Sequence, residues 1–355
     1  MSVVVPVLSL AAAASAAYAG HAVLARHNGD VQAWLVRFLT GPGRTSRLLL
    51  LLFMALNVKS LPFVWTARIF GAMIRHTLWP RKPLPQRALF HYSITRSRTS
   101  LMETDYNFHK SNSTYFADLD ASRTHLVMYL LGPGVAALGQ NAKNKIVMSP
   151  ETGRAMPGSL GVGLGAVFCS FRKEIAPYQP YEMWSRVLAW DRKWLYVMTH
   201  FVVKGKVKPA SFDGSGKPEP AAREWTAADE ANLQKHVIAT AISKYVFKLG
   251  RFTVHPTFLM EHSGLLPERP GESWRGGGPE AVGTMADLDD DEAGEDDEAE
   301  GVSVSAEASD AWTWKNVERE RRRGMALASQ FAALDDAGEL FNGGKNGALG
   351  IFGPG

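Results

Sequence analysis

The order of apolar patterns between residues 89 and 248 is the feature that most constrains the fold. Residues 89–102 alternate apolar and polar side chains in part, as a half-buried strand does. A helix is expected from about residue 113 to residue 130, because helix-capping residue types precede it and Gly132-Pro133-Gly134 follows it. Further strands are expected at 162–175, 181–190, 193–205 and 237–248. Strand, helix and then several strands predict an α+β fold with a mostly antiparallel sheet.

Charge is distributed very unevenly along the 355 residues. Ten of the 35 acidic side chains fall within residues 287–300, which leaves 25 acidic against 39 basic side chains elsewhere. Residues 31–102 contain no carboxylate side chain but eleven lysines and arginines. Such a segment suits an anionic membrane surface or a nucleic acid. Long aliphatic runs separate the basic residues and no nucleic-acid motif occurs, so we expect a membrane surface and no nucleic acid as partner.

The first 25 residues are the candidate membrane anchor. Residues 2–25 carry no charge and are long enough to cross a hydrocarbon core, and the lack of a basic start favours an uncleaved anchor over a cleaved signal peptide. Residues 48–58 and 59–80 predict an interfacial helix pair with Trp65 and Trp79 at the boundary, the alternative being an ordinary amphipathic helix packed on the core. The arginines that follow residue 25 predict a folded part on the cytoplasmic side, on an endomembrane such as the endoplasmic reticulum.

Composition divides the chain into four predicted regions. Pro, Gly and acidic residues indicate disordered or mobile segments, and PRKPLPQ reads as a short rigid linker. The predicted regions are N-terminal membrane-associating helices and linker at 1–86, a folded domain at 87–267 with a mobile insertion at 206–230, an acidic disordered linker at 268–308, and a C-terminal helix and tail at 309–355.

The densest group of chemically active side chains runs from Glu103 to Tyr115. A carboxylate here leaves a predicted strand and is followed within seven residues by the start of a helix. Free N–H groups at a helix start carry a positive partial charge that can polarise a carbonyl oxygen. A nearby carboxylate such as Asp105 can act as nucleophile or as general base on water. The arrangement suits acyl transfer.

This segment resembles the signature of the hotdog-fold thioesterases, roughly Asp-x-Asp-x-x-x-His-x-Asn-Asn-x-x-Tyr followed by an acidic residue and Arg. Ser111 stands where that pattern has its first Asn, and Lys110 where an apolar residue is usual. The positions that match are Glu103, Asp105, His109, Asn112, Tyr115 and Arg123. Three further stretches, at 57–65, 171–197 and 244–254, look like the fungal and animal thioesterase-like branch with an N-terminal membrane segment.

The resemblance implies a long helix wrapped by a curved antiparallel sheet, and a homodimer that binds an acyl thioester at the subunit interface. Acyl-CoA or an acyl chain on a carrier protein is the implied substrate, in lipid or secondary-metabolite biosynthesis. The implied catalytic residues are Asp105, His109 and Asn112. The implied substrate-binding residues are Ser113, Tyr115 and Glu103.

Each of these residues also has a structural interpretation. Asp105 can cap a turn or the helix, His109 can be a structural histidine, and Asn112 can be a helix cap. Tyr115 can belong to the core, and Arg123 can pair with one of the two aspartates at positions 118 and 120. A non-catalytic acyl-binding or scaffold protein, or a dehydratase of the same fold, therefore remain alternative functions.

Other sequence features argue against a disulfide framework, a metal site, a serine hydrolase and a dinucleotide-binding site. Cys169 is the single cysteine, which excludes an intrachain disulfide and a cysteine-rich zinc site. The histidines lack a metal-ligand spacing, no Gly-x-Ser-x-Gly elbow occurs, and the glycines of 161–165 enter a strand rather than a helix. Neither a metal nor a cofactor is expected. Asp191 is predicted to form a turn, with Trp190 and Trp194 in the core.

Overall fold

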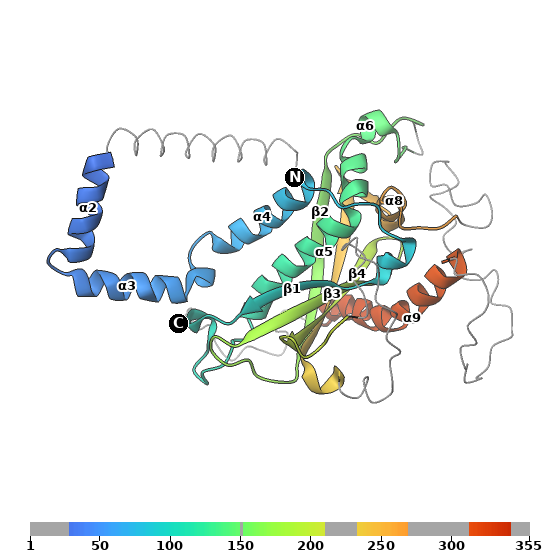
Figure 1. Cartoon of the computed structure of the whole chain (residues 1–355). Helices are drawn as coiled ribbons and strands as arrows, with labels where there is room; N and C mark the ends of the chain where they lie inside the picture. Colours follow the sequence, from blue (N-terminus) through green and yellow to red (C-terminus); the bar gives the residue numbers. More distant parts are fainter. Residues whose placement is uncertain (1–27, 150–151, 210–232, 269–311, 342–355) are drawn as a thin grey trace.

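The computed structural model describes residues 28–149, 152–209, 233–268 and 312–341 (Figure 1). The helices are α2 (Asn28–Thr40), α3 (Arg44–Leu56), α4 (Val64–Leu78), α5 (Thr114–Gly139), α6 (Asn141–Asn144), α8 (Pro256–Glu261) and α9 (Trp314–Ala332). The 3-10 turns are η1 (Val58–Ser60), η2 (Gln86–Phe90), η3 (Leu101–Glu103) and η6 (Ala333–Leu340). The strands are β1 (Ser93–Arg98), β2 (Leu160–Phe171), β3 (Pro180–Trp190), β4 (Trp194–Val203), β5 (Val237–Leu249) and β6 (Phe252–Val254).

All strand pairs of the sheet are antiparallel, which confirms the predicted α+β class. The strand order is β1-β3-β4-β5-β2, and β6 pairs with β5. Asp191 forms the predicted turn between β3 and β4, where its Oδ1 accepts the backbone N–H groups of Lys193 and Trp194. β1 is shorter than predicted because both of its flanks coil into 3-10 turns. At one flank Ser100 and Glu103 form a reciprocal capping box that starts η3.

Helices cover both faces of the sheet (Figure 1). On one face Leu126 and Leu130 of α5 share a core with Val187 of β3 and with Leu195 and Val197 of β4. The alternating residues of the same strands point to the other face, where they pack against α9. α9 lies so close to β3 that a Cβ on Gly324 would be 2.0 Å from the Leu188 carbonyl oxygen. This helix begins at a capping box of Thr313 with Asn316, within the region at 309–355 where a C-terminal helix was predicted.

α5 is longer than predicted and continues through Pro133 to Gly139. Proline removes one helical hydrogen bond and normally bends or ends a helix. Here distant groups supply replacement partners, since the Gly134 N–H donates to Ser263 Oγ at 3.0 Å and the Leu130 carbonyl accepts from Arg81 at 3.1 Å. The predicted end at residue 130 was wrong because these partners come from other elements.

The N-terminal helices behave differently from one another. α4 packs along α5, with His76 Nε2 3.0 Å from His125 Nδ1, so the alternative of an amphipathic helix on the core holds for α4. α2 and α3 extend away from the sheet, and the described part of the chain buries no residue of α3. None of the described helices has both the length and the hydropathy needed to cross a membrane. The candidate anchor at 2–25 lies outside the described residues, as do most of the predicted insertion and of the acidic linker.

Candidate active site

A closed loop at residues 104–110 connects η3 to the start of α5. Thr104 and Lys110 form an antiparallel bridge, and the Asp105 N–H donates to the His109 carbonyl at 3.0 Å. Phe108 adopts a left-handed backbone with φ of 61°, which an L-residue rarely accepts. The aromatic side chains at the tip are open to solvent, Tyr106 at 89% and Phe108 at 74%. The loop is therefore a defined structure that presents side chains outward.

Asp105 and His109 face each other across this loop. One Asp105 oxygen, Oδ1, accepts the Asn107 N–H at 2.9 Å, and the other, Oδ2, lies 3.5 Å from His109 Nδ1. The two side chains are 24% and 23% exposed, so a reactant can approach them. His109 Nε2 lies 3.7 Å from Glu174 Oε1. Asp105 does cap a turn, as the structural interpretation predicted, but only with one of its two oxygens.

Glu174 was not singled out from the sequence, although it lies in the FRKEI stretch that follows β2. Its carboxylate is exposed and approaches His109 from a segment 65 residues further along the chain. The backbone brings the two segments together, because the Lys110 N–H donates to the Ile175 carbonyl at 2.8 Å. A local motif search misses such a neighbour, since the contact depends on how the sheet returns to the loop.

The start of α5 lies beside the Asp105 loop. The Ser111 N–H donates to the Glu103 carbonyl at 2.8 Å, which joins the residues before and after the loop. Asn112 and Ser113 are exposed, and their backbone N–H groups donate to no acceptor among the described residues. The predicted side-chain cap is absent in this part of the chain, because Ser113 has helical dihedral angles and its hydroxyl meets that of Ser111 instead. Two N–H groups are thus open at the positive end of the helix.

The remaining motif residues point inward. Tyr115 is 1% exposed and packs against the rings of Phe171 and Phe201, as its core interpretation predicted. Burial, and secondarily the neighbouring Cys169 and Asp118, raise the pKa of the Tyr115 hydroxyl above its usual range. Arg123 is buried and pairs with Asp120, while its other nitrogen donates to Ser243.

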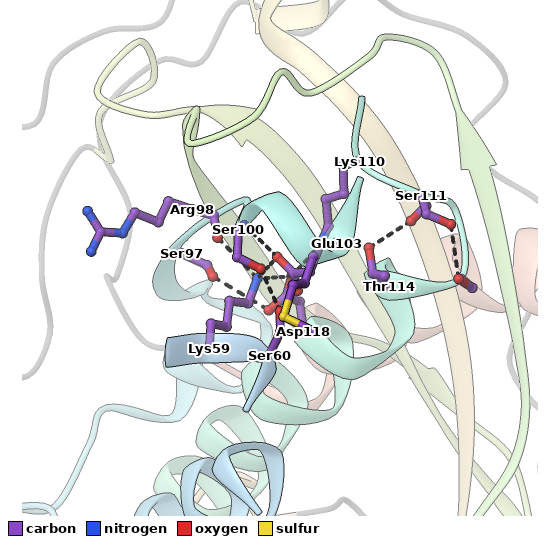
Figure 2. A network of polar contacts seen from close by, with 12 residues as sticks. Lys59, Ser60, Ser97, Arg98, Ser100, Glu103, Lys110, Ser111, Thr114 and Asp118 are labelled. Carbon is purple, nitrogen blue, oxygen red and sulfur yellow. Dashed lines mark hydrogen bonds and ion pairs between the residues drawn. The ribbon is translucent and has the colours of Figure 1, made fainter. Parts of the chain in front are cut away.

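A buried ionic cluster adjoins both ends of the loop and consists of Lys59, Arg68, Glu103, Lys110 and Asp118. Figure 2 shows its members Lys59, Glu103, Lys110 and Asp118. Asp118 Oδ2 is 2.7 Å from Lys59 Nζ and 3.0 Å from Lys110 Nζ, and its Oδ1 is 2.9 Å from Arg68 Nη2. Glu103 lies 2.9 Å from Lys59 and 3.4 Å from Lys110. The Tyr181 hydroxyl also donates to Asp118. Glu103, which was predicted to bind substrate, is buried here and forms ion pairs with Lys59 and Lys110.

Charge balance explains how these groups remain buried. Burial alone would raise the pKa of Asp118, but Lys59, Lys110 and Arg68 outweigh it and hold that pKa well below its usual range. For Lys59 the larger effect is burial, which lowers the pKa of its ammonium group. The sequence held one signal of this cluster: Asp118 shares the inward face of the predicted helix with Tyr115 and Ser122, at spacings of three and four residues.

In the described ranges, no three His, Cys, Asp or Glu side chains come together as metal ligands. Cys169 lies in β2, and burial raises the pKa of its thiol to about 11, so it is a poor nucleophile at neutral pH. Residues 161–165 form part of β2, as predicted. A Cβ on Gly165 would lie 2.4 Å from the Trp194 ring, next to a bulge in the β2–β5 pairing.

Comparison with known proteins places this geometry in a family. A family profile described as "Thioesterase-like superfamily" matches residues 99–228, which include the loop and α5. The probable thioesterase atnL of Emericella nidulans is 34% identical over 324 residues, covering 89% of this chain and 92% of that protein. The chain belongs to the thioesterase-like superfamily.

Two further relatives are similar to most of this chain. Thioesterase poxG of Penicillium oxalicum is 34% identical over 83% of this chain and 89% of its own length. Thioesterase lcsJ of Purpureocillium lilacinum is 30% identical over 81% of this chain and 89% of its own length. Among solved structures, the BH1999 gentisyl-coenzyme A thioesterase matches with a TM-score of 0.29 and 13% identity, over 48% of this chain and 99% of that one.

Proposed function

We infer that this chain is a thioester hydrolase whose catalytic carboxylate is Asp105. The observation that carries the assignment is the partly exposed Asp105 and His109 pair, 3.5 Å apart, beside the open N–H groups at the start of α5. Membership of the thioesterase-like superfamily and the thioesterases among its relatives support the same chemistry. In the hotdog fold that the resemblance implies, a long helix crosses an antiparallel sheet as α5 does here.

In the proposed hydrolysis, each group around the loop has a separate role. The N–H groups of Asn112 and Ser113 bind the carbonyl oxygen, and the negative charge that develops there is favoured by the end of the helix dipole. Asp105 Oδ2 either attacks the carbonyl carbon or removes a proton from the water that attacks it. The C–S bond breaks, the thiolate leaves and takes up a proton, and water supplies the second oxygen of the acid. His109 is placed to orient Asp105 and to pass that proton.

Tyr115 and Glu103 contribute from beneath the surface. Both are buried, so they support the start of α5 and the loop rather than contact the acyl chain. The substrates we propose are acyl thioesters of coenzyme A or of a carrier protein, in lipid or secondary-metabolite biosynthesis. Phe116, exposed on the first turn of α5, and Phe108 offer apolar surface for the acyl chain beside Asp105.

A thiol-release assay tests the assignment. The purified full chain is mixed with acyl-CoA and acyl-phosphopantetheine thioesters of increasing chain length, and free thiol is followed with a chromogenic disulfide. Catalysed release from at least one series is the expected result. Binding of acyl-CoA without release at any chain length would replace the hydrolase with the non-catalytic acyl-binding alternative. Water loss from a hydroxyacyl thioester would favour the dehydratase.

We further propose that the chain forms a homodimer along β2. This edge strand of 12 residues carries no charged side chain and exposes Val162, Leu164 and Phe168. Among the described residues no strand pairs with the outer edge of β2, and a long, apolar edge is a template for strand pairing. β2 leads into the segment of Glu174, so a partner at this edge would lie near the Asp105 loop.

Replacing Leu164 by lysine is expected to weaken this dimer, because it introduces a charge at the pairing edge. Sedimentation velocity should give twice the mass of the chain for the wild type and a larger monomer fraction for the variant. The matched control is Leu327→Lys, at an exposed leucine of α9, which should leave the mass unchanged. A wild type that remains monomeric at every concentration would rule out the dimer.

We propose that the chain associates with a membrane through α3, on the cytoplasmic face of an endomembrane such as the endoplasmic reticulum. α3 exposes a run of leucines at residues 48–52, followed by Phe53, while Arg44 and Arg47 lie at its start. Residues 31–102 contain no acidic side chain to repel an anionic lipid. We propose that α3 inserts this surface at the interface of such a leaflet, with the arginines at the head groups.

The double substitution Leu49→Glu and Leu52→Glu is expected to lower the fraction of protein bound to vesicles of phosphatidylcholine and phosphatidylserine by about tenfold or more. Each leucine side chain that is buried in the membrane contributes roughly 1.5–3 kcal/mol to the free energy of binding. Cosedimentation of the full chain measures this fraction. The control carries the same change at Leu327 and Leu334, exposed residues at the other end of the described chain. Equal binding of wild type, variant and control would contradict a role for α3.

A further inference from the structure

The junction between α3 and α4 contacts the backbone that leads into the Asp105 loop. Asn57, completely buried, donates from Nδ2 to the last turn of α3 and accepts the Met102 N–H at 2.9 Å. Lys59 Nζ donates to the Arg98 carbonyl at 3.2 Å as well as to Glu103. Ser60 Oγ lies 2.5 Å from Ser100 Oγ. We call Asn57, Lys59 and Ser60 the N-terminal clasp.

The clasp holds one end of the loop, and the loop's own residues hold the other (Figure 2). Residues 98–103 lie between the clasp and Asp105, and Glu103 is the last residue that the clasp touches. Lys110, at the far end of the loop, pairs with the same Glu103 and with Asp118. The position of Asp105 relative to α5 is therefore set by ion pairs that meet at Glu103.

Removal of the Lys59 ammonium group would weaken the contacts of η3 and leave those between α4 and α5 in place. Asp118 would keep Lys110 and Arg68 as partners, so the attachment of α4 to α5 remains. Glu103 would keep the Ser100 N–H and, as a cation among the described residues, Lys110, while the Arg98 carbonyl would lose its lysine donor. The contacts that would be lost are therefore those that hold η3 and the loop that follows it.

We propose that Asn57, Lys59 and Ser60 are positioning residues that fix the Asp105 loop against the start of α5. The kinetic part of this proposal rests on the proposed hydrolase function. The clasp makes the segment that follows the exposed helix α3 a part of the catalytic unit. A small displacement of a catalytic group lowers the rate of the chemical step more than it lowers substrate binding.

Two measurements on the full chain with Lys59→Met test the proposal. Hydrogen exchange followed by mass spectrometry reports on the amides of residues 105, 108, 110 and 111. The first two donate hydrogen bonds within the loop, and the other two donate to the carbonyls of Ile175 and Glu103. We expect exchange there to be about tenfold faster or more, with β3 and β4 unchanged. In the thiol-release assay we expect kcat to fall by about 10- to 100-fold, with KM within about threefold of the wild type.

The matched control is Lys244→Met, which removes another buried lysine from its carboxylate, that of Asp335. This pair lies at the α9 face, so exchange should change near α9 and not in the loop, and kcat should stay at the wild-type value. Ser60→Ala, which removes only the hydroxyl contact with Ser100, should change loop exchange and kcat in the same direction by less. This variant decides the question if Lys59→Met does not fold.

Unchanged loop exchange in both clasp variants would overturn the proposal, as would a uniform increase across β3, β4 and the loop. A wild type that hydrolyses no thioester would refute the proposed function, while the exchange data would still decide whether the clasp positions the loop.

Discussion

Asp105→Asn is expected to lower kcat for thioester hydrolysis by about two to three orders of magnitude, because an amide neither attacks a carbonyl carbon nor removes a proton from water. The asparagine retains an oxygen that can accept the Asn107 N–H, so the turn of the loop should persist. A loss of rate with an unchanged thermal midpoint would therefore report on chemistry rather than on folding. Thiol release under saturating substrate gives kcat directly.

Asp191→Asn is the matched control for this substitution. Asp191 also accepts backbone N–H groups in a turn, that between β3 and β4, and lies outside the candidate site. Its amide variant should retain kcat within about twofold, since it alters only a turn and the bond from Tyr196. If Asp105→Asn retains activity as Asp191→Asn does, Asp105 serves only its turn.

Asp118→Asn is expected to lower the free energy of unfolding by about 3–5 kcal/mol, the typical cost of removing one partner from a buried ion pair. Its carboxylate is completely buried, and its loss would leave Lys59, Lys110 and Arg68 with Glu103 as the remaining carboxylate of the cluster. Urea unfolding followed by circular dichroism measures the change. The effect should be largest near neutral pH.

The pH dependence follows from the depressed pKa of Asp118. A carboxyl group whose folded-state pKa lies below its unfolded value stabilises the fold above the unfolded pKa of about 4, and this contribution is lost as the pH falls toward the folded-state value. The difference between the wild type and Asp118→Asn should thus be constant from pH 7 to about 5 and shrink below about 4.

Arg322→Ala supplies the comparison with a surface ion pair. Its partner Glu318 keeps Arg321, and the Arg322 side chain is 45% exposed, so the expected cost is below about 1 kcal/mol. Similar costs for Arg322→Ala and Asp118→Asn would mean that the buried ionic cluster contributes no more than a surface pair.

The sequence predicts those parts of the fold that depend on local patterns. β3 and β4 alternate between the two helix-covered faces, and Asp191 marks their turn, so this hairpin follows from nearby residues. The length of α5 does not, because Ser263 and Arg81 compensate for Pro133 from distant positions. The helix cap predicted at Asn112 is absent among the described residues for a different reason: α5 begins at Thr114, so the N-cap position falls to Ser113, whose helical dihedral angles do not suit a side-chain cap.

In the candidate site, too, residues that are close in sequence were predicted and contacts between distant residues were not. Asp105, His109, Asn112 and Ser113 are close in sequence: Asp105 and His109 meet within one loop, and Asn112 and Ser113 lie at the start of the helix that follows it. The buried ionic cluster was not predicted, since Lys59 lies 59 residues before Asp118. Lys59 also belongs to a basic, apolar segment whose composition is typical of segments that bind a membrane surface. Charge composition describes such a lysine as exposed, whereas its pairing with two carboxylates emerges only from the packing of α4 and η1 on the core.

The most direct measurement is a crystal structure of the full chain with a ketone analogue of an acyl-CoA, in which a methylene group replaces the thioester sulfur. The account predicts that the ketone carbon lies within about 3.5 Å of Asp105 Oδ2 and that its oxygen lies about 3 Å from the N–H groups of Asn112 and Ser113. An ordered analogue bound away from the 104–110 loop, with Asp105 contacting only its own turn, would contradict it.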